Sequence, residues 1–150
     1  MTNDSKILDN LNWKILVELQ KNARISYKDI GDKIGLTGPA VAERIQKLEE
    51  KGIITGYHAK IDLKKIGYSL TAIVNFKFHP GNLDRFINHL KSIPEVFECN
   101  RITGNESMVI KVAIKEPSHL EKLINGFIEF GSPTTSIILS TPIENRVFVG

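Results

Sequence analysis

The spacing of apolar residues changes after Gly52. Before this point, apolar residues recur at steps of three and four, which lines one face of a helix. Between Leu70 and Phe78, every second residue is apolar, which is the period of a strand. Because the two periods belong to different secondary structures, the sequence predicts an α+β protein with a helical first part and a sheet in the second part.

Three short helices are predicted in the first part: residues 9–22, Ser26 to Gly35, and Thr37 to Lys51. Ser26 and Thr37 are residue types that cap helix N-termini, and Asp29 stands where it can bond back to Ser26. Gly35 and Gly52 are suited to the left-handed conformation that ends many helices. These signals together predict where each helix begins and ends.

The third predicted helix has two chemically different faces. Its apolar face carries Val41, Ile45 and Leu48, whereas its polar face carries Pro39, Glu43, Gln46, Lys47 and Glu50. Any small helical bundle shows such periodicity. A tight turn that contains glycine between the last two helices is typical of a helix-turn-helix, which places the N-terminal end of its last helix in the DNA major groove.

The buried side of the helical part is expected to include both of its aromatic residues. Tyr27, Ile30 and Ile34 are predicted to form the buried face of the second helix. Trp13 and Tyr27 are predicted to be core residues rather than side chains that stack on bases. The region after Gly52, residues 53–62, is expected to be extended, which would give the helix-turn-helix a winged form.

The residue spacing in the second part predicts the order strand, helix, strand, strand, helix, strand. This is the ferredoxin-like βαββαβ arrangement. The first strand ends at Pro80-Gly81, the hairpin strands are Glu95 to Thr103 and Ser107 to Lys115, and the last strand is Thr135 to Thr141. Residues 129–133 are expected to be a connection. The sheet face away from the helices would carry apolar residues, so two copies are expected to pack sheet against sheet: Ile73, Val109, Ala113 and Ile138.

The predicted domains are a helix-turn-helix domain over residues 1–62, a connector over 63–68, and a βαββαβ domain over 69–150. The net charge of +3 falls entirely in residues 1–66, which contain 12 Lys and Arg against 9 Asp and Glu. A basic first part favours an acidic partner such as double-stranded DNA, although a solvated surface would also explain so small a surplus.

Several functional classes are not supported by the residues present. The single cysteine, Cys99, cannot form a disulfide framework or a cysteine zinc site, and the four histidines show no metal-ligand spacing, so no metal is expected. We find no glycine-rich phosphate loop and no convincing acid–base pair, and expect no cofactor. The polar residues 1–6 and the lack of a long apolar run favour a cytoplasmic protein without membrane attachment.

Nearly the whole chain resembles the Lrp/AsnC family, the leucine-responsive or feast/famine transcription regulators. The resemblance rests on the ordered string from Ile34-Gly35-Leu36 through Arg44-Ile45 and Leu48-Glu49 to Gly52-Ile53-Ile54 and Tyr57. The second part resembles the RAM-type effector domain of that family. The resemblance implies a DNA-binding regulator that forms dimers and often octamers, with small amino acids as effectors and no enzymatic activity.

The resemblance and the helix-turn-helix together predict the DNA contacts. The tip that enters the groove would be Thr37, Gly38, Pro39 and Ala40, which are also ordinary capping residues. Arg44 and Lys47 would contact phosphates or bases, and Lys28 and Lys33 would contact the backbone. Glu43 would either accept a hydrogen bond from a cytosine or form an ion pair with Lys47, four residues away.

The resemblance also implies an effector site near the hairpin loop, which gives these candidate residues: Thr103, Gly104, Asn105, Glu106, Ser107 and Thr135. Relatives that bind amino acids commonly have Gly-Asp-Tyr-Asp in this loop, whereas this chain has Gly104-Asn105-Glu106-Ser107. Ser107 replaces the acid that would pair with a ligand ammonium group. Glu106 is adjacent, but neighbouring strand residues face opposite sides.

Three functions therefore remain after the sequence analysis. The leading one is a sequence-selective DNA-binding regulator modulated by an amino acid bound between effector domains. A second is a DNA-organising protein that needs no effector, which the altered loop favours. A small ferredoxin-like hydrolase is a third, but Asn100 and Arg101 are consecutive on a strand and would point apart.

Overall fold

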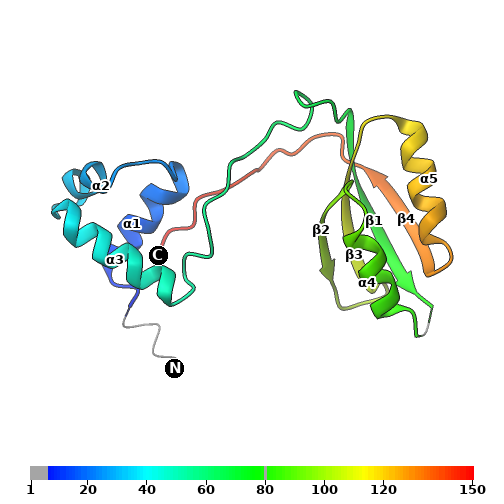
Figure 1. Cartoon of the computed structure of the whole chain (residues 1–150), viewed down its shortest axis with the longest axis horizontal. Helices are drawn as coiled ribbons and strands as arrows, with labels where there is room; N and C mark the ends of the chain where they lie inside the picture. Colours follow the sequence, from blue (N-terminus) through cyan, green and yellow to red (C-terminus); the bar gives the residue numbers. More distant parts are fainter. Residues whose placement is uncertain (1–6, 80) are drawn as a thin grey trace. The chain divides into compact units, whose positions relative to one another are not determined.

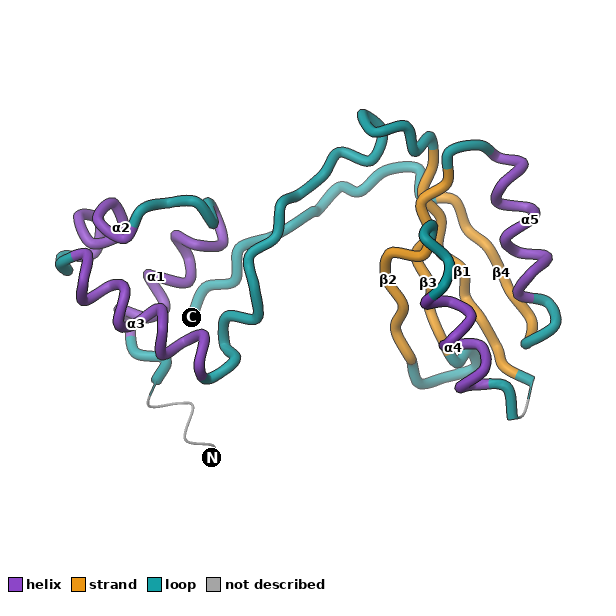
Figure 2. The backbone as a smooth tube through the Cα atoms, in the orientation of Figure 1, coloured by secondary structure: helices purple, strands orange, loops and turns teal. Residues whose placement is uncertain are grey.

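The computed structural model describes residues 7–79 and 81–150 (Figures 1 and 2). The polar N-terminal stretch and Pro80, which figured in the sequence predictions, lie outside the described residues. Contacts divide the chain into a helical unit, which extends to Lys60 and includes Ile143–Gly150, and a sheet unit, Ile61–Pro142. None of the helices in the described part of the chain is long and apolar enough to cross a bilayer.

The helical unit contains α1 (Asn10–Lys21), α2 (Tyr27–Ile34) and α3 (Gly38–Glu50), which confirms the three predicted helices. Ser26 Oγ accepts a hydrogen bond from the Asp29 backbone N at 3.0 Å and donates one to the Asp29 carboxylate at 2.6 Å. Thr37 Oγ1 accepts from the Ala40 backbone N at 3.4 Å. Gly35, with φ of 77°, and Gly52, with φ of 66°, end α2 and α3 in the predicted left-handed conformation.

The helical core joins all three helices through six apolar side chains: Ile15, Leu19, Ile30, Val41, Ile45 and Leu48. Tyr27 is not part of it. This residue occupies the first position of α2 and is 47% exposed, so the prediction of a buried Tyr27 was wrong. Periodicity identifies the face of a helix but not how far along the helix its neighbours cover that face. Trp13 is half-buried.

A close backbone approach at Gly31 builds the turn between α2 and α3. The Gly31 carbonyl accepts hydrogen bonds from the backbone N of Gly35, at 2.9 Å, and of Leu36, at 3.0 Å. A Cβ on Gly31 would overlap the carbonyl oxygen of Leu36. This residue was not predicted from the sequence, where its one signal is a glycine inside a helical pattern.

The sheet unit contains β1 (Leu70–Phe78), α4 (Leu83–Lys91), β2 (Val96–Arg101), β3 (Met108–Ile114), α5 (Pro117–Phe127) and β4 (Gly131–Ile137). The strands are antiparallel in the order β2-β3-β1-β4, which confirms the βαββαβ fold. Both helices pack on one face of the sheet (Figure 1). The core between them is built around Phe76, Phe86 and Phe127, none of which is exposed.

The last strand begins four residues earlier than predicted. Gly131 pairs with Phe78 and Pro133 with Phe76. Residues 131–133, which were predicted to lie in the connection before the last strand, therefore belong to the strand. Proline is tolerated because β4 is an edge strand and needs no further ladder partner. Glycine is required at position 131, where a Cβ would overlap the Phe76 ring and the Lys77 carbonyl oxygen.

The C-terminal residues were predicted to belong to the second domain, but Ile143–Gly150 group with the helical unit. The Gln20 side chain donates to the Phe148 carbonyl at 3.0 Å and accepts from the Phe148 backbone N at 2.9 Å. Lys60 and Glu144 form an ion pair at 2.7 Å. The structure assigns no strand to residues 53–62, so their extended backbone has no ladder partner in the described part of the chain.

We expect Gly31→Ala to destabilise the helical unit by about 1–3 kcal/mol, because its Cβ cannot fit beside the Leu36 carbonyl without moving the turn. Urea unfolding followed by the fluorescence of Trp13, the single tryptophan, reports on this unit. Gly38→Ala is the matched control, since a Cβ at Gly38 would lie 3.6 Å from its nearest neighbour, an ordinary contact. Equal stability of the two variants would contradict the assigned role of Gly31.

Candidate nucleic-acid interface

The polar face of α3 is open to solvent along the whole helix. Its five members are exposed, as predicted: Pro39, Glu43, Gln46, Lys47 and Glu50. The opposite face, with Val41, Ile45 and Leu48, is buried against α1 and α2. Because packing occupies only the apolar face, the other face is free to contact a partner.

The N-terminal end of α3 has small side chains and one backbone donor that the helix does not use. Thr37 is the N-cap and accepts from the Ala40 N–H, and Pro39 has no N–H, so the Gly38 N–H is the first-turn donor left to a partner. Gly38 is not required by packing, since a Cβ there would make only ordinary contacts with α2. Such a helix end attracts phosphate groups, and its small side chains permit close approach.

The three lysines that were predicted to contact DNA all have acidic partners. Lys28 pairs with Asp32 at 2.7 Å, and Lys47 pairs with Glu43 at 2.6 Å, which confirms the ion-pair alternative for Glu43. Both pairs lie on single helices, with more than half of every side chain exposed. The Lys47 ammonium holds the pKa of Glu43 below its usual value. Exposed pairs of this kind contribute little to stability, so the lysines can leave them for another partner.

Lys33 is held more firmly, because its partner lies on another helix. It pairs with Glu18 of α1, whose side chain is only 14% exposed and also binds Lys21 at 2.8 Å. The hydrogen bonds from Lys21 and Lys33 lower the pKa of Glu18. Lys33 therefore ties α2 to α1.

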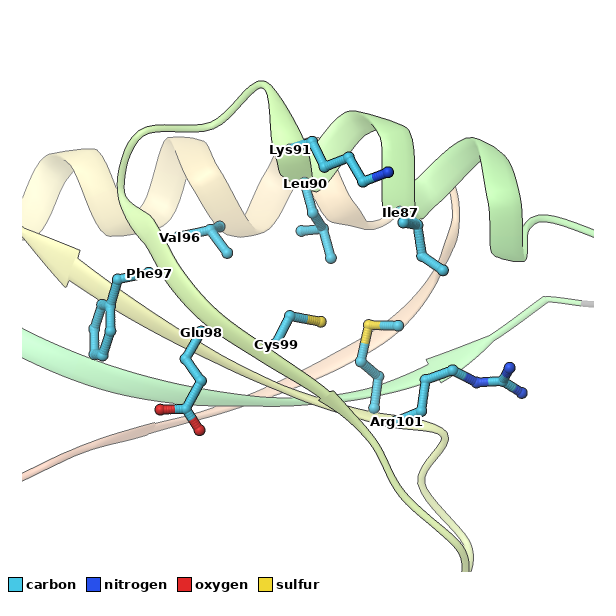
Figure 3. Close-up of a pocket in the computed structure, with 9 residues that line it drawn as sticks. Ile87, Leu90, Lys91, Val96, Phe97, Glu98, Cys99 and Arg101 are labelled. Carbon is cyan, nitrogen blue, oxygen red and sulfur yellow. The ribbon is translucent and has the colours of Figure 1, made fainter. Parts of the chain in front are cut away.

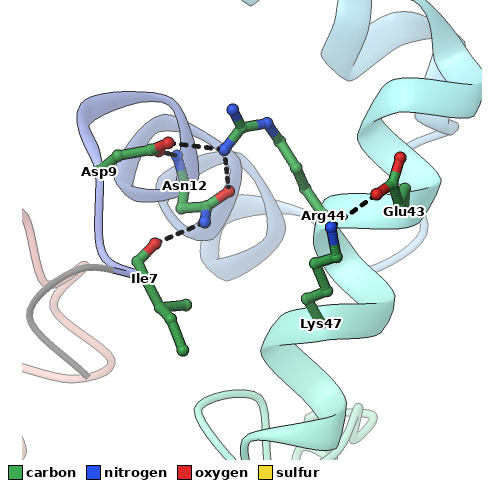
Figure 4. A network of polar contacts seen from close by, with 6 residues as sticks. All are labelled: Ile7, Asp9, Asn12, Glu43, Arg44 and Lys47. Carbon is green, nitrogen blue, oxygen red and sulfur yellow. Dashed lines mark hydrogen bonds and ion pairs between the residues drawn. The ribbon is translucent and has the colours of Figure 1, made fainter. Parts of the chain in front are cut away.

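Arg44 joins α3 to the start of α1 (Figure 4). Its Nη1 donates to Asp9 Oδ2 at 2.8 Å and to Asn12 Oδ1 at 2.9 Å. Asn12 is buried, and its Nδ2 donates to the Ile7 carbonyl at 2.6 Å. Asp9 caps α1 by accepting from the Asn12 backbone N at 2.7 Å, and this hydrogen bond, together with Arg44, lowers the pKa of Asp9. Sequence reasoning missed this network, whose one signal is an aspartate three residues before an asparagine at a helix start.

The predicted effector residues do not all lie together within one chain. Thr103, Gly104, Asn105, Glu106 and Ser107 belong to the hairpin turn between β2 and β3, where the Ile102 backbone N donates to the Ser107 carbonyl at 3.1 Å. Gly104 has φ of 117°, which confirms its role as a turn glycine. Thr135 lies on β4, which β1 separates from β3. The described residues contain no cluster that could hold a metal ion.

Comparisons with known proteins match both units of the chain. Residues 8–55 match a winged helix-turn-helix DNA-binding family, and residues 71–148 match the Lrp/AsnC ligand binding domain. The HTH-type transcriptional regulator LrpB of Bacillus subtilis is 36% identical over 125 residues, which covers 83% of this chain and 84% of that protein.

Two solved structures are similar over nearly their whole length. The structure of B. subtilis LrpC has a TM-score of 0.87 and 31% identity, and covers 93% of this chain and 99% of that chain. The structure of E. coli AsnC has a TM-score of 0.82 and 28% identity, and covers 91% and 95%. These likenesses extend over the three-helix unit and the βαββαβ unit alike. The chain belongs to the Lrp/AsnC family of DNA-binding transcriptional regulators, and it is a regulator with a ligand-binding domain rather than an enzyme.

Proposed function

We propose that the chain regulates transcription by placing the N-terminal end of α3 in the DNA major groove, with Thr37, Gly38, Pro39 and Ala40 nearest to the DNA. The observation that carries this proposal is the exposed polar face of α3, which begins directly after the tight turn built on Gly31. The Gly38 N–H, the positive end of the helix dipole and the small side chains at this end suit a phosphate.

The burial of each ion pair sorts the predicted cations into two roles. Lys28 and Lys47 contact DNA phosphates, because their exposed pairs with Asp32 and Glu43 are weak. Arg44 and Lys33 mainly hold the three helices together. Glu43, once released by Lys47, is available to accept a hydrogen bond from a cytosine amino group.

The face of the sheet that the helices leave open supports self-association. Ile73 and Val109 are half-buried there and Ala113 is 4% exposed. These apolar residues lie among polar ones, since Lys111 pairs with Ile73 in the sheet and forms an ion pair with Glu98 at 2.9 Å. We propose that two copies pack sheet against sheet, which pairs two helix-turn-helix units for spaced half-sites. Larger assemblies such as octamers would then form from dimers.

DNA binding also supports the cytoplasmic location expected from the sequence.

An amino-acid effector is the proposed ligand of the hairpin turn. A Neisseria meningitidis regulator was solved as a complex with L-Met; its chain is 20% identical to this one with a TM-score of 0.87, a likeness that shows the fold alone. Thr135 does not reach the turn within one chain, so the site would be completed by a neighbouring copy. Ser107, in place of an acid, favours the alternative of a DNA-organising protein without an effector.

Lys47→Ala should reduce the slope of log affinity against log salt by about one, because one phosphate contact is lost. Titrations of duplex DNA at several salt concentrations measure this slope. Arg44→Met is the contrasting variant: it leaves the buried Asn12 oxygen without its partner and should destabilise the helical unit by about 1–3 kcal/mol. An unchanged slope for Lys47→Ala would remove this lysine from the interface, and an unchanged stability of Arg44→Met would refute the structural role of Arg44.

Sedimentation velocity at micromolar concentration should show a dimer or a larger assembly. Ile73→Lys, which places an unpaired lysine beside Lys111 on the open sheet face, should dissociate it because an unpaired charge is costly to bury. Lys122→Glu changes an exposed residue of α5, on the other side of the sheet, and serves as a control. A wild-type monomer would exclude sheet-to-sheet packing.

Thermal unfolding against each of the twenty amino acids tests the effector. A ligand that binds only the folded state stabilises it by about 2.7 kcal/mol at a hundredfold excess over its Kd. A saturable rise in Tm is expected with one or a few amino acids, and Ser107→Asp should enlarge it by restoring an acid for the ammonium group. No rise with either protein, while DNA binding persists, would favour the effector-independent role.

A further inference from the structure

We propose that a pocket between α4 and β2 binds an aliphatic carboxylate that carries no ammonium group. The pocket is a cavity of about 380 Å³, which falls in the range of small-molecule sites, roughly 300–1,000 Å³. It is formed by a single chain and shares no residue with the proposed DNA contacts or the hairpin effector site, although Arg101 and Met108 flank the hairpin turn. The inference does not require that the turn bind an amino acid.

The cavity arises because β2 is an edge strand that α4 covers only in part. Val96, Cys99 and Arg101 pair with Val112, Ile110 and Met108 of β3, whose side chains are in the core beneath the helices. On β2 itself, the side chains on this helix-facing side are only half-buried or exposed, so α4 does not cover the strand fully. Ile87 and Leu90 of α4 form the opposite wall, and the lining is largely apolar (Figure 3). An apolar wall of this kind suits an aliphatic chain.

Two cations border the cavity. Lys91 is the last residue of α4, just before the loop that leads into β2, whereas Arg101 is the last residue of β2. Figure 3 shows their side chains on different borders of the pocket, Lys91 on the helix and Arg101 at the far end of the strand. Neither forms an ion pair with any residue that the structure describes. The Arg101 guanidinium, at the end of an apolar cavity, complements a carboxylate head group, and the Lys91 ammonium adds positive charge elsewhere on the rim.

The rim offers no partner for a ligand ammonium group. Its one carboxylate, Glu98, points away from α4 (Figure 3) and is already bound by Lys111 at 2.9 Å and Asn100 at 2.7 Å. Those hydrogen bonds lower the pKa of Glu98, so it stays ionised and paired. An amino acid would bring its positive charge close to Lys91 and Arg101, which disfavours its binding.

Cys99 supplies a direct readout, because it is the single cysteine and its side chain points into the pocket (Figure 3). The full-length protein is alkylated with iodoacetamide at mildly alkaline pH, since burial raises the pKa of the Cys99 thiol. The reaction rate is followed by mass spectrometry with octanoate, octylamine or α-aminooctanoate present. We expect octanoate to slow the reaction saturably and the other two compounds to have little effect.

Arg101→Ala should weaken octanoate binding by about tenfold, since a hydrogen bond to a charged group is lost. Lys122→Ala removes an exposed lysine of α5 outside the pocket and should leave the affinity unchanged. The absence of protection by octanoate would overturn the proposal, as would equal protection by octylamine. A Cys99 that reacts only after unfolding would overturn it as well, because another copy of the chain would then cover the pocket.

Discussion

The contact between Gly31 and the Leu36 carbonyl determines the geometry of the helical unit. It lets the chain reverse within a few residues after α2, so that α3 returns across the same core. Six apolar side chains fill that core, and they occupy only one face of α3. The polar face, with its free helix end, is exposed as a consequence. The surface that we assign to DNA thus depends on one position where no side chain fits.

Charged side chains at the edge of this core differ in whether their partners are buried. A side chain with a buried partner stabilises the fold, whereas one with an exposed partner can bind another molecule. Arg44 donates hydrogen bonds to the buried Asn12 and to Asp9, the N-cap of α1. Its removal would leave the buried Asn12 side-chain oxygen without a donor. Lys47 lies on the same helix, three residues away, yet its partner Glu43 is largely exposed. Both residues are basic and sit in a family DNA-binding motif. Their difference lies in whether the partner is held by the fold.

The sequence predicted the elements whose signals are local, and it failed where distant segments decide. The helix limits at Ser26, Gly35 and Thr37 follow from capping chemistry within a few residues, and β1 follows from strict alternation. The start of β4 was misplaced because Gly131 and Pro133 are poor strand residues in isolation. They belong to the strand because Phe76 approaches Gly131 and because the outer edge of β4 is unpaired. The exposure of Tyr27 and the docking of Phe148 against Gln20 depend on packing in the same way.

The sequence by itself determined the α+β class, the three helices, the βαββαβ order and the membership of the Lrp/AsnC family, because periodicity, caps and motif order are properties of neighbouring residues. Only the tertiary structure decided which cations have partners held by the fold, where the C-terminal residues lie, and that α4 leaves a cavity over the edge strand β2. These outcomes depend on which surfaces meet in space. A basic side chain can bind a ligand in one environment and link two helices in another. The sequence alone does not show which neighbours it has in the folded protein.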